Sequence, residues 1–263
     1  MYQIVLEGTD LKVSKIGFGT AALHHSFTSS TRLSILRTAL DGGITHFDTA
    51  RLYGYGIAES ELGRFFGKNG RKDLTISTKV GFDVSRLQQR FPLTQIMGKG
   101  ILKKIFPNIK KPMMDFSPTG CDTSFSASLR SLNTEWVDIL FVHEPALASF
   151  SQLDKLIPWL ELQKSLGKAR YIGLAGENLL DISNDIISNE IFDVFQTSKH
   201  NLVVSNVSSI RPQIKYGYFS NLSINDREVA MEREACRKSS NMILYSSRQV
   251  ARIKAFCAKF SSD

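Results

Sequence analysis

The sequence lacks a hydrophobic run of the roughly 20 residues that a membrane-spanning helix needs, which argues against a membrane protein. Its first seven residues, MYQIVLE, contain neither the basic region nor the long apolar region of a secretory signal. Cysteine is scarce, and Cys121, Cys236 and Cys257 lie far apart without a CxxC pair. This pattern argues against a disulfide framework and a zinc site, and it predicts a reducing, cytoplasmic location.

Two nucleotide-related motifs are also missing. No G-x-G-x-x-G follows an early strand, which counts against a Rossmann dinucleotide site. The formal net charge is +8, but the basic residues are mostly dispersed and no aromatic residues are interleaved with them, so nucleic acid is not an expected partner. One local group of lysines fits either a solvated loop or the attraction of an anionic substrate or cofactor. It consists of Lys99, Lys103, Lys104, Lys110 and Lys111.

The chain repeats a unit of one short apolar run followed by a segment with helical spacing. Apolar runs occur at about 15–19, 44–48, 74–79, 137–142, 170–175, 191–196, 214–219 and 242–245. Helical spacing occurs at 31–40, 120–132, 151–166 and 250–260, with Asp122 as an N-cap and Gly167 as a stop. Eight such units predict an α/β fold, a single (β/α)8 (TIM) barrel domain over residues 1–263. The seventh and eighth units are weak, so a doubly wound open sheet is the alternative.

Two segments lie outside this repeat. The stretch IVLEGTDLKVSKI alternates apolar and polar residues around a turn, which predicts an N-terminal β-hairpin that caps the barrel floor. The stretch 81–119, after the third strand, is much longer than a usual strand-to-helix connection. We expect it to lie over the mouth of the barrel as a substrate lid or wall.

Polar side chains stand where three consecutive strands end. Asp48, Lys79 and His143 each close an apolar run, and Tyr53 follows in the glycine-rich loop after Asp48. Active sites of such barrels lie at this end, so the four should meet. A lysine paired with an aspartate lowers the pKa of a nearby phenol, and a histidine orients a carbonyl oxygen. Each residue alone also fits a cap, a solvated strand end or a packing role, and their joint occurrence favours proton transfer.

These motifs resemble the aldo/keto reductase family. The signature segment is FDTARLYGYGIAESELGRFF, and KVSKIGFGTAAL, STKVG, SLRSLNTEWVDILFVHEP, GKARYIGLAGEN and FDVFQTSKHN are similar to further segments of that family. The resemblance covers about residues 11–80 and 120–201 well and the remaining chain loosely.

The resemblance implies a metal-free oxidoreductase that uses NAD(P)(H) to interconvert a carbonyl and an alcohol on a small polar substrate, with a sugar-like compound as one candidate. Tyr53 would be the general acid/base, Lys79 and Asp48 its tuning partners, and His143 the group that orients the carbonyl. The implied cofactor-binding residues are Gln196, at the carboxamide, with Gly19, Thr20, Ser246, Ser247 and Arg248. An arginine suits a 2′-phosphate, which favours NADP over NAD.

Three departures from the family pattern concern the cofactor. Ala175-Gly176-Glu177 replaces a Ser-Asn pair, Lys199 stands where an aromatic residue stacks on the nicotinamide, and the C-terminal region is shortened. They motivate an alternative, a catalytically weak aldo/keto reductase-like binding or regulatory protein. The complete set of four catalytic residues argues for the enzyme.

Overall fold

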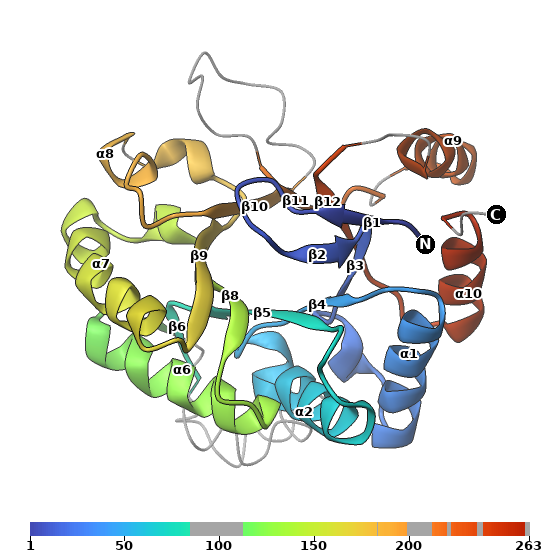
Figure 1. The fold of residues 1–263 in the computed structure, drawn as a ribbon, viewed down its shortest axis with the longest axis horizontal. Helices are drawn as coiled ribbons and strands as arrows, with labels where there is room; N and C mark the ends of the chain where they lie inside the picture. Colours follow the sequence, from blue (N-terminus) through green and yellow to red (C-terminus); the bar gives the residue numbers. More distant parts are fainter. Residues whose placement is uncertain (85–112, 183, 199–211, 220–221, 236–238, 261–263) are drawn as a thin grey trace, which may run out of the picture.

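Eight parallel strands close into a barrel in the computed structural model, which describes residues 1–84, 113–182, 184–198, 212–219, 222–235 and 239–260 (Figure 1). In order around the barrel they are β3 (Ile16–Gly19), β4 (His46–Asp48), β5 (Thr75–Val80), β8 (Val137–His143), β9 (Ala169–Ala175), β10 (Val194–Ser198), β11 (Ile214–Tyr216) and β12 (Met242–Tyr245). Because β12 pairs with β3, the sheet has no open edge. The predicted barrel is confirmed, including its seventh and eighth strands, and the open sheet is wrong.

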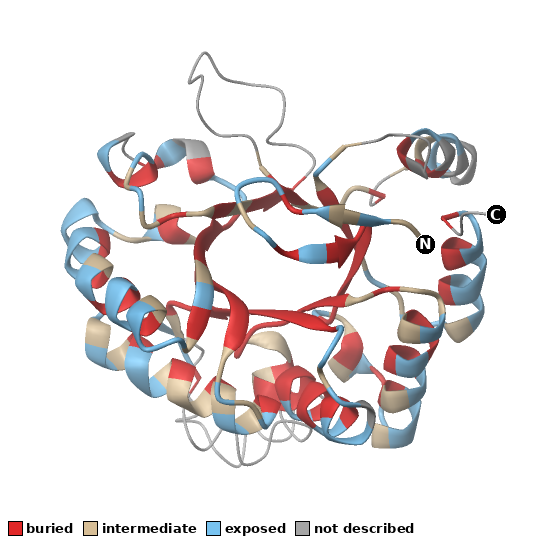
Figure 2. Ribbon diagram, viewed as in Figure 1, coloured by how far each residue is buried: buried red, intermediate tan, exposed pale blue. Residues whose placement is uncertain are grey.

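The barrel strands are continuous apolar runs because both of their faces are covered. Every residue of β5 is buried, as are all but the last of β8. Helices cover the outside (Figure 2). They are α1 (Ser29–Asp41), α2 (Ile57–Asn69), α6 (Pro118–Leu132), α7 (Phe150–Ser165), α8 (Asn184–Ile187), α9 (Ile224–Ala235) and α10 (Val250–Ala258), with short 3-10 turns η1 (Leu23–His25), η2 (Tyr53–Gly56), η3 (Pro145–Leu147) and η4 (Leu179–Asp181). None of these helices is long and apolar enough to cross a membrane.

Helix ends follow local capping chemistry. The Ser149 side chain caps α7 in a capping box with Gln152, and Gly167 ends it with a φ of 68°. The predicted N-cap at Asp122 is wrong, because α6 begins earlier and Ser117 accepts the N–H of Gly120. The Asp122 carboxylate instead accepts a hydrogen bond from the Trp159 indole at 3.1 Å.

The N-terminal hairpin closes the end of the barrel at which the strands begin. β1 (Gln3–Val5) pairs antiparallel with β2 (Lys12–Ser14), and β2 leads directly into β3 (Figure 1). Leu6, Leu11 and Val13 of this segment are buried against barrel residues that include Phe141 and Met242. The predicted hairpin floor is confirmed.

The long connection after β5 leaves and returns through a two-stranded ribbon. β6 (Phe82–Asp83) pairs antiparallel with β7 (Met113–Met114). Most of the predicted lid or wall at 81–119, including its lysines at 99–111, falls on residues 85–112, which lie outside the described residues. The ribbon itself stands beside the mouth of the barrel, since the Phe82 ring lies 5.2 Å from that of His143.

Candidate active site

Five residues, four from barrel strands and one from a turn, meet at the carboxyl end of the barrel. Asp48 closes β4, Lys79 lies at the end of β5, His143 closes β8 and Gln196 lies in β10. Together with Tyr53 they line one cavity of about 310 Å³. Parallel strands bring their carboxyl ends to a common edge, so residues far apart in the sequence become neighbours.

The cavity floor is a buried ion pair. The Lys79 ammonium lies 2.8 and 2.7 Å from the two Asp48 oxygens and also donates to the Thr49 carbonyl at 2.9 Å. Ser77 and Gln196 supply two more hydrogen bonds to Asp48. Burial lowers the pKa of Lys79, but the Asp48 and Tyr53 side chains outweigh it, so the net pKa is raised. A fixed positive charge therefore stands at the base of the cavity.

Tyr53 reaches this charge because of the glycines that follow it. Gly54 and Gly56 have φ values of 61° and 94°, and a Cβ on Gly54 would lie 2.3 Å from the His24 Cβ. The Lys79 Nζ atom lies 4.8 Å from the centre of the Tyr53 ring. Burial raises the pKa of Tyr53 more than Lys79 lowers it. The expected net lowering of this pKa is therefore wrong, and the phenol is held protonated.

His143 faces Tyr53 across the cavity as a neutral imidazole. The two ring centres are 6.1 Å apart, with the planes nearly perpendicular. Burial lowers the pKa of His143 to about 3, the Lys79 charge lowers it too, and Asp48 raises it. A neutral ring can hydrogen-bond an oxygen without bringing a second charge to it.

Gln196 carries the clearest sign of an absent polar ligand. Its amide nitrogen donates to Asp48 at 3.1 Å, which fixes the orientation of the amide. The remaining oxygen, Oε1, is buried and has no hydrogen-bond partner among the described residues. Buried acceptors normally find a donor, so this oxygen fits the amide N–H of a bound carboxamide.

Only some of the other predicted cofactor residues line this cavity. Gly19 and Ser246 line the same cavity. Thr20 does not, because its backbone N–H and its hydroxyl both donate to the Asp48 carbonyl. Lys199 lies outside the described residues.

A second cavity, of about 550 Å³, continues from the first. Gly217, Leu244 and Ser246 line both, and Ser247 lines the second. Three basic residues surround it: Arg227, Arg252 and Lys259. Arg248 is exposed and lines neither cavity.

Sequence reasoning missed several residues of the first cavity. Tyr216 ends β11 and is half-buried on the wall, and Glu144 follows His143 directly. The same strand-end rule could have found Glu144, whereas Tyr216 lies inside the expected apolar run at 214–219. Glu177 departs from the family pattern, and the sequence of its own segment does not indicate that it lines this cavity.

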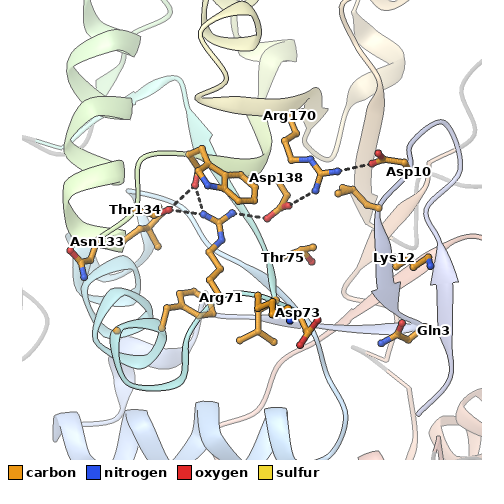
Figure 3. A pocket seen from close by; sticks show the side chains of 17 residues that line it. Gln3, Asp10, Lys12, Arg71, Asp73, Thr75, Asn133, Thr134, Asp138 and Arg170 are labelled. Carbon is orange, nitrogen blue, oxygen red and sulfur yellow. Dashed lines mark hydrogen bonds and ion pairs between the residues drawn. The ribbon is translucent and has the colours of Figure 1, made fainter.

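A larger cavity, of about 670 Å³, lies at the opposite end of the barrel (Figure 3). Arg71 and Arg170 point toward one another there and share Asp138, at 2.7 and 3.2 Å. Arg170 also pairs with Asp10. Since these charges satisfy one another, the cluster ties the starts of neighbouring strands together.

Curated relatives of this chain include two sugar dehydrogenases. D-threo-aldose 1-dehydrogenase of Pseudomonas sp is 28% identical over 169 residues, which are 62% of this chain and 50% of that protein. L-galactose dehydrogenase of Arabidopsis thaliana is 30% identical over 177 residues, 65% of this chain and 47% of that protein. The chain thus spans about half the length of these curated relatives.

Solved structures show the same fold. An aldo-keto reductase from Bacillus halodurans, in its holo form, superposes with a TM-score of 0.71 at 18% identity, covering 100% of this chain and 92% of that one. A model of the family described as "Aldo/keto reductase family" matches residues 15–251. Its span includes all eight barrel strands and every residue that lines the cavity of about 310 Å³. The chain belongs to the aldo/keto reductase family.

Proposed function

We propose that this protein is an NAD(P)(H)-dependent oxidoreductase that interconverts a carbonyl and an alcohol on a small polar substrate. The observation that carries the proposal is the position of Tyr53, a protonated phenol above the Lys79–Asp48 pair and opposite a neutral His143. A cytoplasmic location stays a prediction from the scarcity of cysteine.

These groups divide the chemistry among them. His143 hydrogen-bonds the substrate oxygen and holds it toward Tyr53. In reduction Tyr53 donates its proton to that oxygen, and the Lys79 charge stabilises the resulting phenolate. In oxidation the phenolate takes the proton back. A bound nicotinamide cofactor supplies or accepts the hydride.

The chain has residues suited to hold that cofactor. Gln196 Oε1 can accept from the carboxamide, and the Tyr216 ring stands on the same wall and can stack on the nicotinamide. The continuous second cavity, with its three basic residues, suits the phosphates. Arg227 and Arg252 are therefore better placed than Arg248 to favour NADP over NAD, and binding constants for the two cofactors with Arg252→Ala would test this.

The substrate class rests on the relatives. Two of them are named as dehydrogenases of an aldose and of L-galactose. A cavity of about 310 Å³ lined by carboxylates, phenols and an amide suits a compact, hydroxylated compound. We infer that an aldose or a related lactol is the substrate.

The alternative is a binding or regulatory protein with little turnover. Ala175-Gly176 favours it, because neither side chain offers a hydrogen bond to a carboxamide where a Ser-Asn pair would. The buried Lys79–Asp48 pair argues against it, since a scaffold has no need for this costly arrangement beside a phenol.

A direct test mixes the purified protein with reduced or oxidised nicotinamide cofactors and a panel of aldehydes and aldoses, and follows nicotinamide absorbance. Tyr53→Phe should lower kcat by about 100-fold or more. The matched control is Tyr55→Phe, which removes a phenol from the same turn, η2, and should change kcat little. Undiminished turnover by Tyr53→Phe contradicts the acid/base assignment, and tight cofactor binding without any turnover favours the alternative.

A further inference from the structure

Two glutamates form one wall of the cavity of about 310 Å³ that Tyr53 and His143 line, hereafter the catalytic cavity. Glu144 follows His143 directly, and Glu177 lies two residues beyond the end of β9. Glu144 is half-buried, and its Oε2 accepts the backbone N–H of Glu177 at 3.2 Å. Both residues line the cavity together with Tyr53 and His143.

The backbone holds Glu144 in this position at some cost. Its φ and ψ angles are 50° and 52°, a left-handed conformation that residues other than glycine, asparagine and aspartate rarely adopt. Its N–H donates to the Ala175 carbonyl at 2.7 Å, which anchors the strained residue to β9. Strain of this kind clusters at functional sites.

Gly176 provides the space that the Glu144 carboxylate occupies. A Cβ atom on Gly176 would lie 2.8 Å from Glu144 Oε2 and 3.2 Å from the Glu144 Cα. Any side chain at 176 would therefore displace the carboxylate. The glycine at this position and the glutamate at 144 form one coupled feature, because each directly follows one of two paired strands, β9 and β8.

The described residues of this cavity carry more negative than positive charge. Lys79 is the single cation among them, and both oxygens of Asp48 already bind it. Glu144 and Glu177 then remain as carboxylates that only accept hydrogen bonds. The unpaired Gln196 Oε1 lines the same cavity and is a further buried acceptor, suited to the cofactor carboxamide.

We propose that Glu144 and Glu177 make the catalytic cavity selective for hydroxyl-rich neutral or cationic carbonyl substrates, such as aldoses and amino sugars, over substrates that bear a carboxylate or phosphate. The inference rests on the proposed oxidoreductase function and narrows its substrate class. Substrate hydroxyl or ammonium groups donate to the two carboxylates, whereas an anionic group meets like charge at short range in a partly desolvated site.

The test compares three sugars that differ in one group: glucose, glucuronate and glucosamine. Burial raises the pKa of Glu144 above its ordinary value. The kcat/KM values are therefore measured at about pH 7, well above the ordinary glutamate pKa of about 4.3, where the amine of glucosamine is still largely protonated. We expect kcat/KM for glucuronate to be at least about tenfold below that for glucose. Glu144→Gln and Glu177→Gln should raise the glucuronate-to-glucose ratio several-fold. Gly176→Ala should also raise it, because it displaces the Glu144 carboxylate without removing it.

The dependence of kcat/KM on salt concentration provides a second readout, which partial unfolding of a variant would not reproduce. Raising the ionic strength from about 0.01 to about 0.1 M shortens the Debye length from about 30 to about 10 Å. This should raise kcat/KM for glucuronate in the wild-type protein and change that for glucose little. The control variant is Glu135→Gln, which removes an exposed carboxylate distant from this cavity and should leave the ratio unchanged.

A binding measurement separates this inference from the proposed function. Saturation-transfer NMR with the same three sugars reports occupancy without turnover. Weaker signals for glucuronate than for glucose, with no turnover of either, support the charge selectivity while the oxidoreductase proposal fails. Equal or stronger signals for glucuronate, an absence of signals from all three sugars, or a ratio that Glu144→Gln and Glu177→Gln leave unchanged overturn the inference.

Discussion

Lys79 sets the charge balance of the catalytic cavity, because its ammonium satisfies both oxygens of the buried Asp48. Replacing it with methionine leaves Asp48 as an uncompensated buried charge. We expect Lys79→Met to lower the free energy of unfolding by about 3–5 kcal/mol and to abolish measurable turnover. Urea denaturation, followed by circular dichroism, measures the first effect.

The matched control for this prediction is Lys164→Met. Lys164 pairs with Asp193 at 2.8 Å in the same way, but the pair is partly exposed. Its loss should cost about 1 kcal/mol or less and should leave turnover intact. Equal destabilisation by the two substitutions would show that burial of the Asp48–Lys79 pair is not what makes it important.

The pKa values of Tyr53 and His143 predict the pH dependence of the reaction. Reduction needs the protonated phenol, and burial raises the pKa of Tyr53. The rate of carbonyl reduction should therefore stay level through neutral pH and fall only above the ordinary phenol pKa of about 10. Oxidation needs the phenolate, so its rate should rise with pH.

His143 adds a sharper expectation to the same profile. Because burial lowers its pKa to about 3, the imidazole stays neutral from there upward. The profile of kcat/KM for reduction should show no ionisation near the ordinary histidine pKa of about 6.5. A clear inflection there, lost in His143→Gln, would contradict the assignment of a neutral hydrogen-bonding role.

At the scale of elements, Asp138 links four segments at the floor of the barrel (Figure 3). It stands early in β8 and accepts hydrogen bonds from Arg71 at 2.7 Å, from Arg170 at 3.2 Å and from the N–H of Ile76 at 2.8 Å. Its loss leaves the mostly buried Arg71 without its carboxylate. We expect Asp138→Ala to cost about 3 kcal/mol in thermal or chemical unfolding.

The control for this prediction comes from the same cluster. Asp10 also pairs with Arg170, but its side chain is 72% exposed. Asp10→Asn should change stability by about 0.5 kcal/mol or less. The substrate KM of folded Asp138→Ala should equal that of the wild type, because the catalytic cavity lies at the opposite end. A changed KM would show that the two ends of the barrel are coupled.

Strand ends were predictable from sequence because a polar residue that closes an apolar run stands out. Asp48, Lys79 and His143 were found in this way. Tyr216 ends a strand of three residues, Ile214–Tyr216, too short to mark its own boundary. The contact of Glu144 with Gly176 joins two strands and has no signature in either segment alone.

Helix starts and pKa values show the limits of local sequence reasoning. Asp122 and Ser117 are both good N-cap residues, and the sequence does not decide at which one the helix begins. The direction of the Tyr53 pKa shift depends on burial, which outweighs the neighbouring lysine. The order of the strands is enough to infer that Lys79 lies near Tyr53. The burial that raises the Tyr53 pKa arises only when the whole barrel closes.

At the scale of the whole molecule, the barrel encloses titratable groups that stay neutral when it folds. His46 is fully buried, with Thr75 Oγ1 at 2.9 Å and Ser77 Oγ at 3.2 Å from its ring nitrogens. Burial lowers the pKa of His46 to about 4 despite the opposing effects of Asp48 and Asp138. His143 shares this direction, at about 3. Unfolding returns both rings to water, where they bind protons more readily.

This difference predicts that the protein loses stability as pH falls from about 6.5 toward 4, because the unfolded chain then binds more protons than the folded one. Each of the two histidines should contribute about 2 kcal/mol of loss between pH 7 and pH 5. Urea denaturation at a series of pH values measures the slope. His46→Gln and His143→Gln should each reduce it, and His25→Gln, at an exposed position, should not. A slope that survives removal of both buried imidazoles would assign the acid sensitivity to carboxylates instead.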